Sequence, residues 1–354
     1  MTVTTSAPAE PSVRPRLVTG GSRFLRAIAR NPKALAGTLL MLVFCFLAAF
    51  PGFVAKDNPN AINYAPLLRP SGQHLIGTNG LGQDLWAQLI YGTRYSLYIA
   101  FAVGGLSTII SVIVGVSAAY LGGIVDDVLS FVTDVLLVIP TFPLIIVIVA
   151  YTQNAGFWVL TAVLVITGWS YGARQLRVQA LSLRHRDFLE AARVRGERSI
   201  YIIVVEILPT MTSLIVASFL GSALYAVLAA AGVSFVGLGD PNTISWGTML
   251  NSAQQGNALG SGLWAWAIMP GIALALLGAA FALLNYAFDE ISNPALRPVR
   301  KVSASAARRS GTLAGGGGRD PRDLPALAEL GGGATFAGTR ATGAIGGPEG
   351  AANA

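Results

Sequence analysis

The sequence predicts an all-α integral membrane protein with six transmembrane helices. Three observations support this fold class: hydrophobic residues make up 53% of the chain, charged residues make up only 12%, and the apolar residues gather in long runs. Soluble domains carry about twice that charged fraction, and an apolar run of about twenty residues matches the thickness of a bilayer. A soluble helical protein with a large core would not need such runs.

The first three expected spans lie in the amino-terminal half of the chain. The first covers about residues 34–54 and is too long, without a convincing cleavage site, to be a cleavable signal peptide. The second, 96–120, contains glycines that permit close helix approach. The third, 129–151, is interrupted by Pro140 and Pro143, which break backbone hydrogen bonds and predict either plain kinks or a pathway-lining segment.

The remaining three spans surround a polar segment. The fourth covers about 157–171, and a polar segment from 172 to 199 separates it from the fifth, at about 202–232. A loop that contains Trp246 leads to the sixth span, at about 264–288.

The distribution of basic residues predicts the orientation of these spans. Lysines and arginines gather before the first span, between the fourth and fifth, and after the sixth: Arg14, Arg16, Arg23, Arg26, Arg30 and Lys33; Arg174, Arg177, Arg184, Arg186, Arg193, Arg195 and Arg198; Arg297, Arg300 and Lys301. Six spans place all three groups on one face, which the positive-inside rule makes cytoplasmic. The net charge of +7 therefore indicates membrane topology and contact with anionic lipid, and it does not indicate nucleic acid binding.

The expected domain organisation follows from these segments. Residues 1–22 form a disordered cytoplasmic amino terminus, and 23–300 form the six-helix domain with a cytoplasmic loop at 172–200. Residues 301–354 are rich in Gly, Ala, Ser and Arg, so they cannot bury enough apolar surface to fold, and we expect a disordered cytoplasmic tail.

The sequence argues against an enzyme. Its two histidines, His74 and His185, fall in predicted loops on opposite sides of the membrane, and no His/Cys cluster has metal-ligand spacing. None of its three lysines follows a glycine, so no Gly-Lys-Ser/Thr phosphate loop is present. We expect no metal and no cofactor on this chain, and any ATP and Mg²⁺ used in transport would lie on partner subunits.

Asp134, at the start of the third span, has two interpretations. A single intramembrane acid can serve as an ion or proton site in a secondary transporter. The interpretation we favour is a buried acid that pairs with a neighbouring helix near the cytoplasmic end, because one acid is a thin basis for an ion relay.

A short polar stretch from Glu190 to Gly196 predicts a docking surface. Its first residues are good helix formers, and Gly196 can adopt the positive φ of a sharp turn, so the pattern predicts a helix, a turn and a second helix. Because the stretch lies between two membrane-length apolar segments, it should project on one side of the bilayer.

These residues resemble a known family. Glu190-Ala191-Ala192, Gly196 and Ile207-Leu208-Pro209 match the EAA pattern of importer-type ATP-binding cassette (ABC) permeases. Four further stretches look like the dipeptide, oligopeptide and nickel permease group: His74 to Asp84, Tyr91 to Arg94, Ser234 to Gly239, and Ser245 to Leu250. The order of the motifs and the extra first span point to the C-type subunit, and the resemblance covers Arg23 to Arg300.

The resemblance implies the type I ABC importer permease fold and a partner-driven importer in a prokaryotic cytoplasmic membrane. Its implied partners are a B-type permease, two ATP-binding subunits and an extracytoplasmic substrate-binding protein. The residues expected to couple to an ATP-binding subunit are Glu190, Ala191, Ala192, Gly196, Leu208 and Pro209. Residues that could line or gate the pathway are Asp134, Pro140, Ser234, Gly237 and Gly239.

The chain departs from the family pattern at three positions, and these departures leave the identity of the transported solute open. Asn79 and Gln83 stand where the external motif more often has Asp and Arg, and Ala230 stands where an acidic residue is common. Peptides are the expected solute, and nickel chelates, opines and oligosaccharides are alternatives within the same architecture. Two alternatives from other classes are an ion-coupled transporter that uses Asp134 and a membrane scaffold without solute flux.

Overall fold

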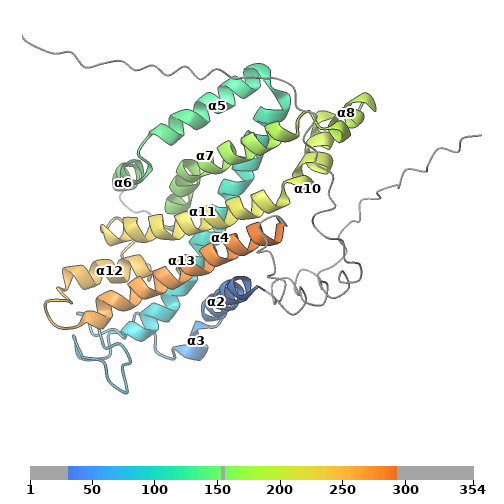
Figure 1. The fold of residues 1–354 in the computed structure, drawn as a ribbon. Coiled ribbons are helices and arrows are strands. Elements are labelled where there is room, and N and C mark those ends of the chain that lie inside the picture. The colour runs from blue at the N-terminus through green and yellow to red at the C-terminus, as the bar shows by residue number, and fades with distance from the viewer. Residues whose placement is uncertain (1–30, 153–155, 293–354) are drawn as a thin grey trace, which may run out of the picture. The chain divides into compact units, whose positions relative to one another are not determined.

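The computed structural model describes residues 31–152 and 156–292, and both predicted tails, 1–22 and 301–354, lie outside the described residues. The described residues form helices and loops, with one isolated β-bridge between Thr78 and Asp84. Figure 1 shows the helices in chain order: α2 (Pro32–Ala49), α3 (Pro51–Val54), α4 (Leu85–Leu121), α5 (Gly123–Val138), α6 (Thr141–Tyr151), α7 (Phe157–Leu183), α8 (Asp187–Val194), α9 (Ser199–Tyr201), the π-helix η1 (Ile202–Ile207), α10 (Leu208–Thr210), α11 (Thr212–Phe235), α12 (Trp246–Gln255) and α13 (Trp264–Ser292).

Four of the described helices are long and apolar enough to cross a membrane: α2, α4, α11 and α13. Helices α5 and α6 together make a fifth candidate, bent by 85°. The all-α membrane fold is therefore confirmed, and the predicted count of six spans is compatible with it but not confirmed. The remaining expected span is the apolar first half of α7, which continues as a polar helix.

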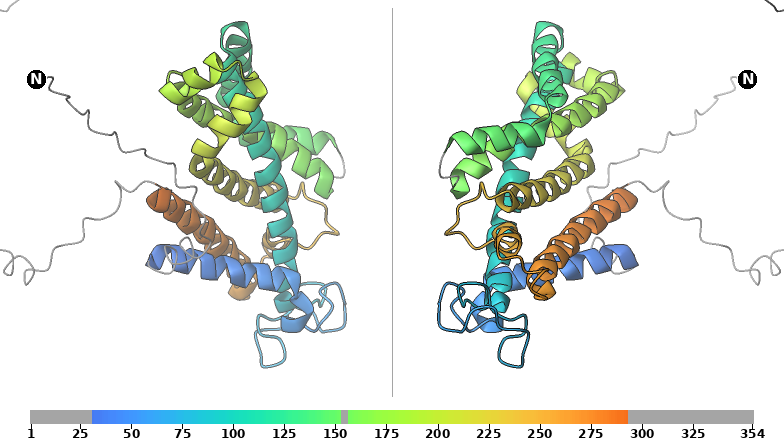
Figure 2. Two further views of the ribbon diagram at one scale, coloured as in Figure 1. Left: turned by 90° about the vertical axis from the view of Figure 1, so that its right-hand side faces the viewer. Right: turned by 90° about the vertical axis from the view of Figure 1, so that its left-hand side faces the viewer.

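Helix α4 is the central element of the helical domain. It packs along α7 on one side and α11 on another, and α11 in turn contacts α13, which lies beside α2 (Figure 2). Gly115 lets α4 approach α7 closely, since a Cβ there would collide with the carbonyl oxygen of Ala173. Gly104 allows a similar approach to Ala223 on α11. These glycines confirm the close packing expected from the second span.

Helices extend beyond the predicted spans in three places, in ways that hydropathy could not reveal. Helix α4 begins at Leu85, eleven residues before the expected start at 96, because the Asp84 carboxylate caps it by accepting from the Ala87 amide at 2.8 Å. Helix α7 continues through the segment predicted to leave the membrane at residue 172 and ends at Leu183. The predicted loop around Trp246 contains α12, whose capping box joins Ser245 and Thr248.

The predicted third and fifth spans are present as broken helices. Pro140 begins the bend between α5 and α6, and Ile139 before it is extended, as a residue before proline prefers. The fifth span starts as π-helix η1, in which the Leu208 amide donates to the Ile203 carbonyl. Pro209 has no N–H to donate to the preceding turn, and the π-helix gives way to the single turn α10; the long helix α11 begins at Thr212, after Met211.

Candidate coupling and pathway sites

Helix α8 presents one buried and one exposed face. Leu189 and Ala192, three residues apart, are fully buried in an apolar cluster with the ends of α4 and α7, including Val116 and Leu176. Glu190 and Ala191, like the neighbouring Arg193 and Val194, are exposed. The helix is thus held by its apolar side and offers its Glu-Ala face to solvent or to a partner.

The predicted turn after this helix is present at Gly196. Its φ is +76°, and its amide donates to the carbonyl of Arg193 at 2.9 Å, while the Glu197 amide donates to the Ala192 carbonyl at 3.2 Å. These two hydrogen bonds form a Schellman motif, which closes the helix and favours glycine at the left-handed position. Gly196 therefore sets the direction in which the chain leaves α8.

Contacts from the turn hold it against neighbouring elements. The Arg195 guanidinium lies 3.6 Å from Glu206 on η1 and 3.8 Å from Glu197. The Arg193 guanidinium lies 5.3 Å from the ring centre of Tyr120 at the end of α4. Each of these contacts is exposed and individually weak. Together they orient the turn relative to both α4 and η1.

Leu208 and Pro209, the last residues of the EAA pattern, lie directly behind α8. Leu208 packs at the edge of the same apolar cluster as Leu189, and Ile207 is buried within it. Pro209 is exposed and follows the π-helix described above. The two halves of the pattern thus form one packed unit, in which Ile207 and Leu208 contact the apolar cluster that holds the buried face of α8.

Two Asp–Arg pairs join α5 to α7. Arg177 donates from Nε and Nη2 to the two carboxylate oxygens of Asp126, at 2.6 and 2.8 Å. Asp134 pairs with Arg174 at 3.2 Å, as expected for an acid that meets a neighbouring helix, but the expected burial is wrong: its side chain is 59% exposed. A cavity of about 140 Å³ lies beside both pairs, between α4, α5 and α7.

Ser234, Gly237 and Gly239 form the end of α11. Gly237 has φ +89°, and its amide donates to the Ser234 carbonyl, so a second Schellman motif closes this helix. Gly239 lies against the Ser234 side chain, where a Cβ would collide. These positions have a clear structural role, and the geometry itself assigns them no gating movement.

The two motifs around Ser234 and Trp246 meet each other and α4. Gly247 packs against Ala231 and Ser234 on α11. Trp246 is buried, its indole Nε1 donates to the Leu89 carbonyl on α4 at 2.9 Å, and Gly92 lies next to the Cδ1 atom of the indole. Sequence reasoning identified these stretches only through the resemblance and missed their contact. The available signal for a packed helix was a tryptophan followed directly by a glycine, Trp246-Gly247.

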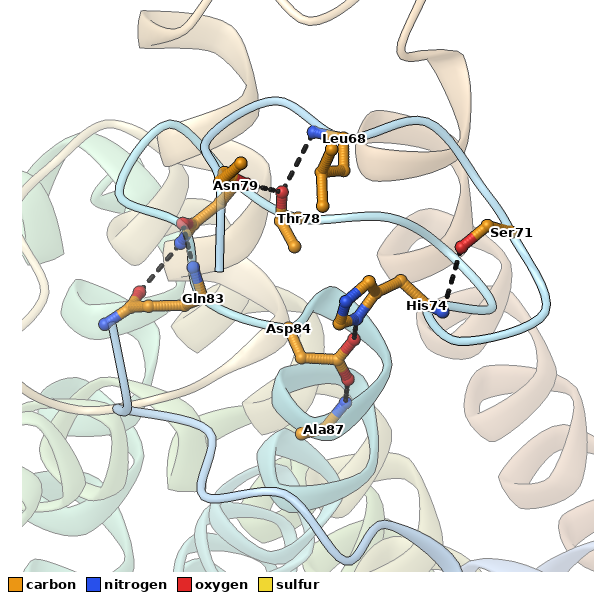
Figure 3. A network of polar contacts seen from close by, with 9 residues as sticks. Leu68, Ser71, His74, Thr78, Asn79, Gln83, Asp84 and Ala87 are labelled. Atoms are coloured by element: carbon orange, nitrogen blue, oxygen red, sulfur yellow. Dashed lines mark hydrogen bonds and ion pairs between the residues drawn. The ribbon is translucent and has the colours of Figure 1, made fainter. Parts of the chain in front are cut away.

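The loop that precedes α4 is built from polar contacts (Figure 3). His74 Nδ1 lies 2.9 Å from Asp84 Oδ1, and both residues are buried. The Thr78 hydroxyl accepts from the Leu68 amide and donates to the Ala65 carbonyl. Asn79 Nδ2 donates to Gln83 Oε1 at 2.7 Å, so the two residues that replace a charged pair still contact each other.

The loop and α8 lie at opposite ends of α4. The loop surrounds the first turn of α4, whereas α8 packs near its last turns (Figure 1). Within residues 31–152 and 156–292 there is no group of three His, Cys, Asp or Glu side chains that could hold a metal ion.

Residues 111–297 match the family model described as the inner membrane component of binding-protein-dependent transport systems. This chain belongs to that family. The match runs from the second half of α4 through α8 to α13, so it includes both α8 and the end of α11.

Curated permeases match a larger part of the chain. The oligopeptide transport system permease protein of Mycobacterium tuberculosis is 34% identical over 282 residues, which cover 78% of this chain and 95% of the relative. A putative peptide transport system permease protein of Brucella abortus is 30% identical over 276 residues, covering 77% and 91%. The dipeptide transport system permease protein of Bacillus subtilis is 28% identical over 277 residues, covering 77% and 85%.

Proposed function

We propose that this permease is the C-type transmembrane subunit of an ABC importer that carries peptides across the cytoplasmic membrane of a prokaryote. The observation that carries the proposal is α8: its Leu189–Ala192 face is fixed in the helical domain, while Glu190 and Ala191 face outward. A short helix fixed in this way can pass a rigid-body displacement from an ATP-binding partner to the membrane helices.

The proposed assembly contains a B-type permease, two ATP-binding subunits with their ATP and Mg²⁺, and an extracytoplasmic substrate-binding protein. Both termini and α8 would be cytoplasmic, and the loop before α4 would face outward. Helix α5 has a strongly exposed apolar side, with Ile124, Phe131 and Val138 more than two-thirds exposed. A second permease or lipid would cover that side. This chain would itself hydrolyse no ATP.

Peptides are the proposed solute because the similar permeases from Mycobacterium and Brucella carry peptide or oligopeptide transport in their names. Nickel chelates, opines and oligosaccharides fit the same architecture. The substrate-binding protein would select among them, because it delivers the solute to the permease.

The test is co-purification of the tagged chain from its native membrane, with partners identified by mass spectrometry. Wild type should retain a second permease and ATP-binding subunits. Ala191→Arg places a large cation on the exposed face of α8 and should release the ATP-binding subunits while the second permease remains. Ser182→Arg, an exposed position on α7 before this helix, is the matched control and should retain both.

A wild-type chain that purifies alone, yet drives uptake into liposomes under an ion gradient, would contradict the importer proposal. In that case, Asp134→Asn should abolish uptake if Asp134 is the ion site. Partner binding without solute flux in the complete assembly would instead support a scaffold.

A further inference from the structure

A cavity of about 470 Å³ lies between the loop that precedes α4 and the segment that leads into α12. Its volume falls in the range of small-ligand pockets. Five of its lining residues are asparagine or glutamine: Asn60, Asn79, Gln83, Gln88 and Asn242. Threonine and serine hydroxyls complete the polar part of the wall, and none of the lining residues is charged.

Part of this wall is fixed by hydrogen bonds between amides. Gln83 Oε1 accepts from both Asn79 Nδ2, at 2.7 Å, and Gln88 Nε2, at 2.8 Å. Gln88 Nε2 also donates to the Pro59 carbonyl at 3.2 Å. Asn79 and Gln88 are only 5% and 7% exposed. Figure 3 shows the Asn79–Gln83 contact within the loop. The wall is therefore preorganised, which lowers the entropic cost of binding a ligand.

Other polar groups of the wall have no hydrogen-bond partner within the described part of the chain. Gln88 donates from its nitrogen, but its Oε1 accepts no hydrogen bond there. The side-chain amides of Asn60 and Asn242 likewise have no partner among those residues. Acceptors and neutral donors side by side in one wall fit a ligand that offers both N–H and C=O groups.

We propose that this cavity binds the backbone of an uncharged stretch of peptide on the outer side of the permease. The choice of a peptide in transit as the occupant rests on the proposed function. A charged ligand would lose hydration without a counter-charge. No aromatic ring lines the cavity, so the wall offers no stacking surface for the apolar face of a sugar.

The test uses the purified full-length chain in lipid nanodiscs and a photoreactive probe. The probe is tetra-alanine with an acetylated amino end, an amidated carboxyl end and one residue replaced by photo-leucine. After irradiation, mass spectrometry should locate the label in residues 57–64, 79–88 and 241–252. Unlabelled capped tetra-alanine should compete with the probe, whereas maltotriose should not.

Two substitutions then link the label to the cavity. Asn242→Trp should narrow the cavity and reduce labelling by about fivefold, equivalent to the loss of one good contact. Asn60→Asp should shift the preference toward a capped peptide that contains lysine by about two- to fivefold. Asn58→Asp is the matched control, because Asn58 lies on the same loop without lining the cavity, and aspartate keeps the oxygen that accepts from the Asn60 amide.

Labelling outside the three segments, or equal competition by maltotriose, would overturn the proposal. The proposal is also overturned if the complete importer shows no labelling, because a partner subunit would then occupy the cavity. The nanodisc assay needs no ATP-binding subunit, so its failure is separate from failure of the proposed function. If the partner subunits co-purify with the chain but the probe does not label it, the cavity proposal is overturned and the proposed function stands.

Discussion

The Nε1 atom of Trp246 donates a hydrogen bond to the carbonyl oxygen of Leu89, across 157 positions of sequence. This contact fixes the start of α12 against the first turns of α4. The Trp246 ring also lies 5.8 Å from the ring of Phe44 on α2, in an edge-on arrangement. Three segments that are distant in the chain therefore meet at one buried indole.

Trp246→Phe should destabilise the protein by about 1 kcal/mol, because the ring remains but the hydrogen bond is lost. Trp246→Ala should cost about 3–5 kcal/mol, since it also leaves a cavity. Thermal unfolding of the purified chain in detergent measures both changes. Trp264→Phe is the control, because that tryptophan is 55% exposed. Equal effects at positions 246 and 264 would contradict the assigned contact.

The Arg177–Asp126 pair should contribute more to stability than the Arg174–Asp134 pair. The first is bidentate and partly buried, whereas both side chains of the second are more than half exposed. A double-mutant cycle with Arg177→Gln and Asp126→Asn should give a coupling energy of about 1.5–3 kcal/mol. The matched cycle with Arg174→Gln and Asp134→Asn should give less than about 1 kcal/mol.

Gly196→Ala should disturb the turn after α8 because an alanine at φ +76° costs about 1–2 kcal/mol. Gly196→Asn should cost less, since asparagine tolerates the left-handed region. Hydrogen exchange at α8 and retention of the ATP-binding subunits measure the local and functional effects. Alanine and asparagine variants with identical exchange would show that the backbone of the turn differs from the one described.

Gly115→Ala should separate α4 from α7, because its new Cβ would collide with the carbonyl oxygen of Ala173. Overpacking of this kind costs about 1–3 kcal/mol. Gly105→Ala on the same helix meets no atom within 4 Å, so it should be neutral or stabilise the helix by up to about 1 kcal/mol. Thermal unfolding of the two variants in detergent checks the predicted difference in sign.

The spans were predictable because an apolar run carries its own signal, as the runs before Ala49 and Phe288 show. The polar continuation of α7 gave no such signal. The second half of α7 continues as helix while Arg177 meets Asp126 on a neighbouring element, a partner that periodicity cannot name. Pro140 predicted a break in the third span, but the 85° angle depends on how α6 packs on α7.

The candidate site was predictable to a similar extent. Gly196 marked a turn because few residues adopt positive φ, and the turn is present. The buried face of α8 depends on Val116 and Leu176, which come from two other helices. The amide-lined cavity was not predicted, because its wall joins Gln88 with Asn242 and each amide on its own is an ordinary polar residue.

Helix α4 runs from the polar loop to α8 without a proline along its 37 residues. Gln88 in its first turn lines the amide-rich cavity, and Val116 near its last turn belongs to the apolar cluster beneath α8. A helix of this length extends about 55 Å, so a rotation of about 5° around one end moves the other end by about 5 Å. A small angular change beneath α8 thus becomes a displacement of several ångströms at the cavity, and no part of α4 needs to unfold.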